Sequence, residues 1–205
     1  MPKKLKMPLP YLSYSAFDLY QRDPMEFYQQ YFIGRVDRAT PKMILGKIFQ
    51  EAWSDPKYDY VAELRKAGFT SNYERIIKTA LTHPQTINLP KGKCEKKFIV
   101  KGRGLNYPIM GIFDGDDEDK ELIVENKFGA VWSKSTVETH KQLTWYSLVN
   151  KIKRGYIPKV LLQSFNSKNG IPTKFLVKRS ALEIDRLVQE INEMVAKVEN
   201  GIFNN

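Results

Sequence analysis

The amino-acid sequence predicts an α/β protein in which helices flank one mixed β-sheet. Three observations support this fold class: a helical pattern fills roughly the first 90 residues, strand-like runs follow, and helix and strand patterns then alternate. The 205 residues are enough for one domain with a core of its own. We therefore expect a single domain over residues 1–205, mostly helical at 1–90, with the sheet core and C-terminal helices at 91–205.

The N-terminal part shows helical periodicity in three segments. Ser13 or Ser15 can cap a first helix, and the pair Asp23-Pro24 restarts it, because aspartate is a good N-cap and proline is favoured at the first helical position. Apolar residues then recur at helical spacing over residues 41–53. A third helix is expected over residues 71–82, where a serine and a glutamate three residues later form a capping-box pattern.

Strand-like runs replace this periodicity in the middle of the chain and again near its end. Turn residues separate the first three runs, and Asn169-Gly170 has the composition of a hairpin turn between the last two. A long helix before the last two strands and an amphipathic helix at the end complete the order. The expected strands cover residues 97–103, 107–115, 121–128, 159–165 and 173–178, and the two helices cover residues 133–153 and 182–198.

Composition excludes several classes of protein. The single cysteine, Cys94, excludes an intramolecular disulfide framework and a cysteine-rich zinc or iron–sulfur site. No stretch approaches the roughly 20 apolar residues of a membrane span, and the N-terminus lacks the apolar segment of a signal peptide. We expect a cytoplasmic protein that does not associate with a membrane.

The charged residues are unevenly distributed along a chain with a net charge of +10. Residues 139–182 contain no Asp or Glu but many Lys and Arg, whereas carboxylates crowd residues 114–125. This separation favours a polyanion at the basic region and cations at the acidic one. The alternative is a solvated surface that keeps the protein soluble.

The acidic cluster lies within two strands that are otherwise apolar. If the turn between these strands is centred after Glu118, then Asp114 lies opposite Ile123, and Glu125 lies one pair further along on the same face. Such diagonal neighbours are ~7–8 Å apart, and Lys127 points to the same side. Charges in a buried strand are costly unless they are paired or bound to a metal. The alternative is an ordinary solvated hairpin.

Three motifs in this order resemble those of the PD-(D/E)XK nucleases, specifically the RecB-like exonuclease branch. They are Gly111 to Asp114, Glu125 to Lys127, and Gln142 to Tyr146. Upstream, residues 46–51 resemble the first motif of this branch, and residues 14–28 resemble its N-terminal signature. The resemblance implies a restriction-endonuclease-like αβββαβ core and a metal-dependent deoxyribonuclease, an exonuclease of DNA recombination, repair or viral DNA processing.

On this resemblance, Asp114 and Glu125 hold Mg²⁺ or Mn²⁺ through oxygen ligands, together with the Asn126 carbonyl and Gln50 or Glu51. The branch often has histidine where this chain has Gln50, so the site has a weaker ligand there. The helical spacing places position 50, and not 51, over the sheet. Where relatives with an iron–sulfur cluster have a cysteine, this chain has an aspartate before a proline, so no cluster is expected.

The resemblance also assigns roles in the reaction. Lys127 orients the attacking water or helps to deprotonate it, and stabilises the transition state. Gln142 and Tyr146, four residues apart on one helix face, position Lys127 or the DNA strand; the alternative for this pair is packing and capping of the helix. His83 and His140 have no partner at metal-ligand spacing and are expected at the surface.

DNA is the expected partner, and lysine-rich contacts favour its backbone over its base sequence. Two alternatives stay open: a nonspecific endonuclease or nickase with the same site, and a non-catalytic DNA-binding protein whose nuclease site has decayed. A homo-oligomer or a recombination partner protein is also compatible with this reading. The expected DNA contacts are Lys141, Lys151, Lys153, Arg154 and Lys168.

Overall fold

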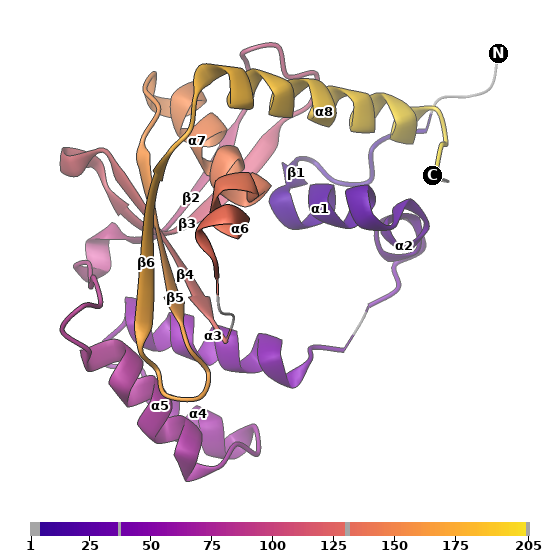
Figure 1. Cartoon of the computed structure of the whole chain (residues 1–205). Helices are drawn as coiled ribbons and strands as arrows, with labels where there is room; N and C mark the ends of the chain where they lie inside the picture. The colour runs from indigo at the N-terminus through magenta and orange to yellow at the C-terminus, as the bar shows by residue number, and fades with distance from the viewer. Residues whose placement is uncertain (1–4, 37, 130–131, 204–205) are drawn as a thin grey trace.

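The computed structural model describes residues 5–36, 38–129 and 132–203, and it confirms the α/β fold class. Within these residues, six strands form one mixed sheet with helices on both faces (Figure 1). The strands are β1 Leu12–Ser13, β2 Cys94–Val100, β3 Ile109–Asp117, β4 Leu122–Phe128, β5 Lys159–Phe165 and β6 Pro172–Lys178. No helix in the described part of the chain has the length and apolar composition to cross a membrane.

The helices begin at the residues that favour helix starts. The Ser13 hydroxyl accepts the N–H of Ala16 and caps the first helix, and Asp23 caps the next one, with Pro24 at its first position. The helices are α1 Tyr14–Arg22, α2 Pro24–Tyr28 with a π-helical turn Gln29–Ile33, α3 Pro41–Ser54, α4 Tyr60–Lys66, α5 Ser71–Thr82, α6 Lys134–Thr139, α7 Lys141–Arg154 and α8 Ala181–Glu199.

The sheet opens between β3 and β4. One edge of β3 pairs with antiparallel β2, from Gly115 back to Ile109. The other edge pairs with parallel β1 at Ile109 and Met110, and with antiparallel β4 only over residues 115–117. No described strand pairs with residues 111–114 on this second edge. From Val124 onward β4 leaves β3 and continues beside parallel β5, so the two strands diverge at Asp114 and Glu125.

Each face of the sheet has its own hydrophobic core. On one face α1, α7 and α8 pack around large buried side chains such as Phe17, Phe113 and Trp145. On the other face α3, α4 and α5 pack around residues such as Phe49 and Phe165. Figure 1 shows these two groups of helices on opposite sides of the sheet. The opening between β3 and β4 therefore lies between two packed layers.

Several expected elements differ from the observed ones. The expected helix over residues 133–153 is wrong, because the chain breaks at His140 and forms α6 and α7. The capping box at Ser71 is also wrong: Thr70 is the N-cap, and Glu74 forms an ion pair with Arg65. Two elements, α4 and the short β1, were not expected. The final helix and the last two strands lie within a residue or two of their expected bounds.

The register of β3 and β4 is two residues away from the expected one. Ile123 pairs with Asp116 and not with Asp114, because a 3₁₀ turn over Glu118–Lys120 and a left-handed Glu121 move the centre of the turn. A shift of two residues leaves each side chain on its expected face. Asp114 and Glu125 are therefore the first residues on each strand beyond the last pair.

The loop between β5 and β6 packs closely on α5. Gly170 has a φ of +75°, and a Cβ there would overlap the carbonyl oxygen of Ile76 and lie 3.0 Å from the Ala80 nitrogen. We expect Gly170→Ala to lower the free energy of unfolding by about 2 kcal/mol, from the left-handed backbone and from overpacking. Gly155→Ala is the matched control, because Gly155 has a φ of +87° and open space around its Cβ position. Equal losses in urea unfolding would contradict this role of the contact.

Candidate active site

The two carboxylates singled out in the sequence meet where β3 and β4 diverge. The Asp114 Oδ2 atom accepts the backbone N–H of Asn126 at 2.7 Å, which ties the free edge of β4 to β3. Glu125 is 2% exposed, and its Oε1 atom lies 2.5 Å from the Lys127 ammonium. Asp114, Glu125 and Lys127 thus share one face, as expected from the alternation of side chains along a strand.

Burial and mutual repulsion shape the charges of this group. Burial, and then the negative charge of Glu125, raises the pKa of Asp114 well above its usual range. Burial alone would lower the pKa of Lys127, but the charges of Glu125 and Asp114 and the hydrogen bond to Glu125 outweigh it, and the net shift is upward. Lys127 is therefore an ammonium that partly neutralises two crowded carboxylates.

The first turn of α7 supports Glu125. The Gln142 Nε2 atom donates to Glu125 Oε1 at 2.9 Å and lies 2.6 Å from the Tyr146 hydroxyl. Burial, followed by the charges of Glu125 and Asp114, raises the pKa of Tyr146. The two residues lie on one helix face as the sequence predicts, and their contacts hold the Glu125 carboxylate in place.

A second set of polar side chains borders the opening from the α3 side. The Asn126 Nδ2 atom donates to Gln50 Oε1 at 3.3 Å, and Gln163 Nε2 on β5 donates to Asn126 Oδ1 at 3.0 Å. Glu51 instead lines a groove between α3 and α4 with Tyr58. Position 50, and not 51, therefore lies against the sheet.

Four other acids of the β3–β4 turn form ion pairs with nearby cations: Asp116, Asp117, Glu118 and Asp119. Asp116 receives both terminal nitrogens of Arg154 at 2.9 and 2.6 Å, and Asp117 lies 2.5 Å from Lys93 and 3.0 Å from Lys120. In the described part of the chain, no three or more His, Cys, Asp and Glu side chains are arranged to hold a metal ion. These acids of the turn thus form an ion-pair network, whereas Asp114 and Glu125 lie just beyond the last β3–β4 pair.

Sequence comparisons with protein-family models and with curated proteins give no match. Among solved structures, a candidate exonuclease from Eubacterium rectale superposes with a TM-score of 0.64 and 12% identity, over 95% of this chain and 83% of that one. The alkaline exonuclease LHK-Exo from Laribacter hongkongensis gives a TM-score of 0.51 and 14% identity, over 95% and 91%, both alone and in complex with dAMP. The chain has the fold of these exonuclease structures.

The structure does not gather the expected DNA contacts into one surface. The Arg154 side chain, expected to contact DNA, is only 12% exposed and forms ion pairs with Asp116 and Glu118. Lys141 pairs with Glu190 at 2.6 Å near the start of α7. The other three lie apart from the carboxylates: Lys151 and Lys153 are roughly 15 Å along α7 from Gln142, and Lys168 is in the β5–β6 loop.

His140 is half-buried beside the site, which corrects the expectation that it lies at the surface. Its ring centre is 4.6 Å from that of Trp132 and 6.1 Å from that of Tyr14, and its Nδ1 atom has no hydrogen-bond partner among the described atoms. Burial, and then the charge of Lys127, lowers its pKa to about 4. The sequence did not predict this partly buried position, because His140 has no neighbouring residue at metal-ligand spacing.

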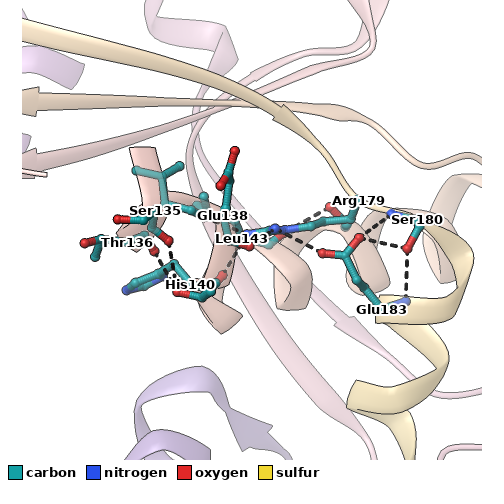
Figure 2. Close-up of polar contacts among 11 residues, drawn as sticks. Ser135, Thr136, Glu138, His140, Leu143, Arg179, Ser180 and Glu183 are labelled. Carbon is teal, nitrogen blue, oxygen red and sulfur yellow. Dashed lines mark hydrogen bonds and ion pairs between the residues drawn. The ribbon is translucent and has the colours of Figure 1, made fainter. Parts of the chain in front are cut away.

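The break between α6 and α7 is held by Arg179, which lies between β6 and α8 (Figure 2). Its guanidinium donates to the carbonyl oxygens of Val137 at 2.8 Å and His140 at 3.2 Å, and also to that of Glu138. Glu183 accepts a further bond at 3.1 Å. These contacts satisfy carbonyl groups at the end of α6, and so they hold the break that directly precedes α7 and Gln142.

The low pKa of His140 predicts a pH-dependent loss of stability. As the pH falls from its ordinary pKa of 6.5 towards 4, the unfolded chain gains a proton that the folded chain does not take up, so stability falls. We expect His140→Phe, which retains an aromatic ring, to lose less stability than the wild type between pH 7 and pH 5 in urea unfolding. A larger loss in the variant would contradict a neutral, buried His140.

Proposed function

We propose that this protein is a metal-dependent deoxyribonuclease, an exonuclease that hydrolyses DNA phosphodiester bonds. The observation that carries the proposal is the convergence of Asp114, Glu125 and Lys127 at the point where β3 and β4 diverge. The fold shared with exonuclease structures and the ordered motifs resembling the RecB-like PD-(D/E)XK branch support the same function.

The donor set fits a divalent cation. Glu125 Oε2 is buried and has no hydrogen-bond partner among the described atoms, and Asp114 is held close to it despite the repulsion between the two charges. Both costs would be offset by a hard cation with oxygen ligands, such as Mg²⁺ or Mn²⁺. When bound, such an ion supplies an activated water and neutralises charge on the phosphate.

The backbone of Asn126 contributes a third oxygen to this proposal. In a strand, the N–H and C=O of one residue point to the same side. The N–H of Asn126 points at Asp114, so its carbonyl oxygen also points to the opening between β3 and β4. We propose Asp114, Glu125 and this carbonyl as the protein ligands, with water in the remaining positions.

Lys127 and the first turn of α7 complete the proposed mechanism. Lys127 lies 2.5 Å from Glu125, so its ammonium would orient the attacking water and stabilise negative charge on the phosphate oxygens. Gln142 donates to one oxygen of Glu125 and contacts Tyr146, and the second oxygen of Glu125 has no hydrogen-bond partner among the described atoms.

Cleavage assays with two DNA substrates test this function. End-labelled linear DNA and covalently closed circular DNA are incubated with Mg²⁺, Mn²⁺ or EDTA, and Glu125→Gln protein purified in parallel reports any contaminating nuclease. An exonuclease degrades the linear DNA only, whereas an endonuclease or nickase also cuts the circle. A DNA-binding protein with a decayed site cuts neither, yet its affinity for DNA falls steeply with salt.

Metal binding is also expected to stabilise the fold. At about 100 times its dissociation constant, a bound ion adds ~2.7 kcal/mol, which raises the Tm of a domain of this size by roughly 5–10 °C. Mn²⁺ should act at lower concentration than Mg²⁺. Glu125→Gln should abolish the shift, whereas Asp119→Asn, at a side chain that is 87% exposed, should retain it. Equal shifts in both variants would place the ion elsewhere.

A further inference from the structure

The orientation of one buried amide is fixed by the backbone of Ile87. Gln163 on β5 is fully buried, and its Oε1 atom accepts the Ile87 N–H at 2.7 Å while its Nε2 atom donates to the Ile87 carbonyl at 3.0 Å. A backbone N–H can only donate and a carbonyl can only accept. Only one of the two amide orientations of Gln163 satisfies both bonds, so this side chain has a defined donor end.

The orientation of Gln163 determines the orientations of the Asn126 and Gln50 amides. The donor end of Gln163 also faces Asn126 Oδ1, so the NH₂ group of Asn126 faces away, towards Gln50, and donates to Gln50 Oε1. The Gln50 oxygen therefore accepts a bond inside the protein. Its Nε2 atom is buried and has no hydrogen-bond partner among the described atoms. The unsatisfied group of Gln50 is thus a donor, and an amide NH₂ cannot bind a cation.

Gln50 borders a pocket that also contains Lys127. This pocket, of about 350 Å³, is lined by residues of α3 and by Asn126, Lys127 and Phe128. An anionic oxygen that enters it comes close to Gln50 on α3 and to residues 126–128 of β4. A buried donor without a partner is costly, and an acceptor supplied by a ligand removes that cost.

Gly46 gives a second indication of a ligand at the same place. It lies one turn before Gln50 on the same face of α3 and borders the same pocket. A Cβ at Gly46 would meet no atom within 4 Å, so packing within the protein does not require glycine there. Glycine inside a helix is unfavourable, but it permits close approach of a ligand to the backbone.

We propose that Gln50 binds the substrate and not the metal ion: its amide NH₂ donates to a non-bridging phosphate oxygen of the DNA strand that passes Gly46. This inference rests on the proposed nuclease function. It replaces the expectation that Gln50 is a weak metal ligand, because its oxygen is committed to Asn126. The metal ion then has two side-chain ligands, and Gln50 binds the phosphate instead.

Two binding affinities of the Gln50→Met variant distinguish phosphate binding from metal binding by Gln50. Methionine has a similar length but lacks the amide. The first is for a short DNA duplex in EDTA, by fluorescence anisotropy, and the second is for Mn²⁺ without DNA, by electron paramagnetic resonance. We expect DNA binding to weaken about tenfold, as for loss of a hydrogen bond to a charged group, and Mn²⁺ affinity to stay within about twofold. Glu51→Gln is the matched control, because Glu51 is the neighbouring residue and lines the groove between α3 and α4. It should change neither affinity by more than about twofold.

Any other pattern in Gln50→Met overturns the proposal: weaker Mn²⁺ binding would make Gln50 a ligand, and unchanged DNA binding would remove it from the substrate site. If Gln50→Met does not fold, the side-chain amide signal of Gln50 in ¹⁵N-labelled wild-type protein decides. It should shift on addition of DNA in EDTA, and no shift overturns the proposal. Wild-type protein that neither binds nor cleaves DNA would instead refute the proposed function itself.

Discussion

Asp114→Asn is expected to reduce DNA cleavage at least about 100-fold and, at the same time, to raise the Tm of the metal-free protein. The carboxylate is a proposed metal ligand, so its loss removes the ion from the reaction. The stability gain follows from its raised pKa: once the pH exceeds the ordinary aspartate pKa, the unfolded chain ionises freely, whereas the folded chain must keep the proton or hold a charge that burial and Glu125 disfavour. Asparagine retains an oxygen for the Asn126 N–H.

Asp117→Asn is the matched control on the same strand. Hydrogen bonds and ion pairs with Lys93 and Lys120 lower the pKa of Asp117, so its charge favours the folded state. This variant should therefore lose stability and retain cleavage, the reverse of Asp114→Asn. Thermal unfolding in EDTA and a cleavage assay at saturating Mn²⁺ measure both effects. Normal cleavage by Asp114→Asn would place the active site elsewhere in the molecule.

Lys127→Met is expected to lower cleavage by about 100-fold or more even at saturating metal, because the ammonium that stabilises the phosphate charge is lost. In EDTA the variant should also be less stable than the wild type, since two crowded carboxylates lose their cation. Added Mn²⁺ should narrow that stability difference without restoring cleavage. This separation distinguishes a role in the reaction from a role in folding.

Lys134→Met provides the control for removing a lysine near the site. Lys134 lies on α6, its side chain is 85% exposed, and its distance to Glu138 is 3.9 Å. It should retain both cleavage and stability, because exposed ion pairs contribute little. If Lys127→Met cleaved DNA as well as Lys134→Met does, the assigned site would be wrong.

The sheet and the central group of the site could be predicted from sequence because their signals are local. Acidic residues and a lysine within apolar strands indicate a buried charged group, and the alternation of side chains places Asp114, Glu125 and Lys127 on one face. The register could not be obtained in the same way. It depends on the 3₁₀ turn after Asp117, and no local pattern distinguished turns of different length at this position.

Other features depend on residues that are far apart in the chain. The basic region around Arg154 suggested a DNA contact, but in the folded protein Arg154 forms an ion pair with Asp116. The break at His140 has no proline or glycine to mark it, and three carbonyl groups there are satisfied by Arg179. The donor end of Gln50 is set through two other side chains by Ile87. Such partners exist only in the folded molecule.

The Arg179 contacts have a consequence for synthesis of the protein. A ribosome releases all the proposed metal ligands, Lys127 and the whole of α7 before Arg179 emerges. Until then the carbonyl groups at the end of α6 lack their donor, and the start of α7, with Gln142, is not fixed. We therefore expect a nascent or prematurely terminated chain to carry every proposed catalytic group and yet to be inactive, so that cleavage begins only once the last part of the chain has been made.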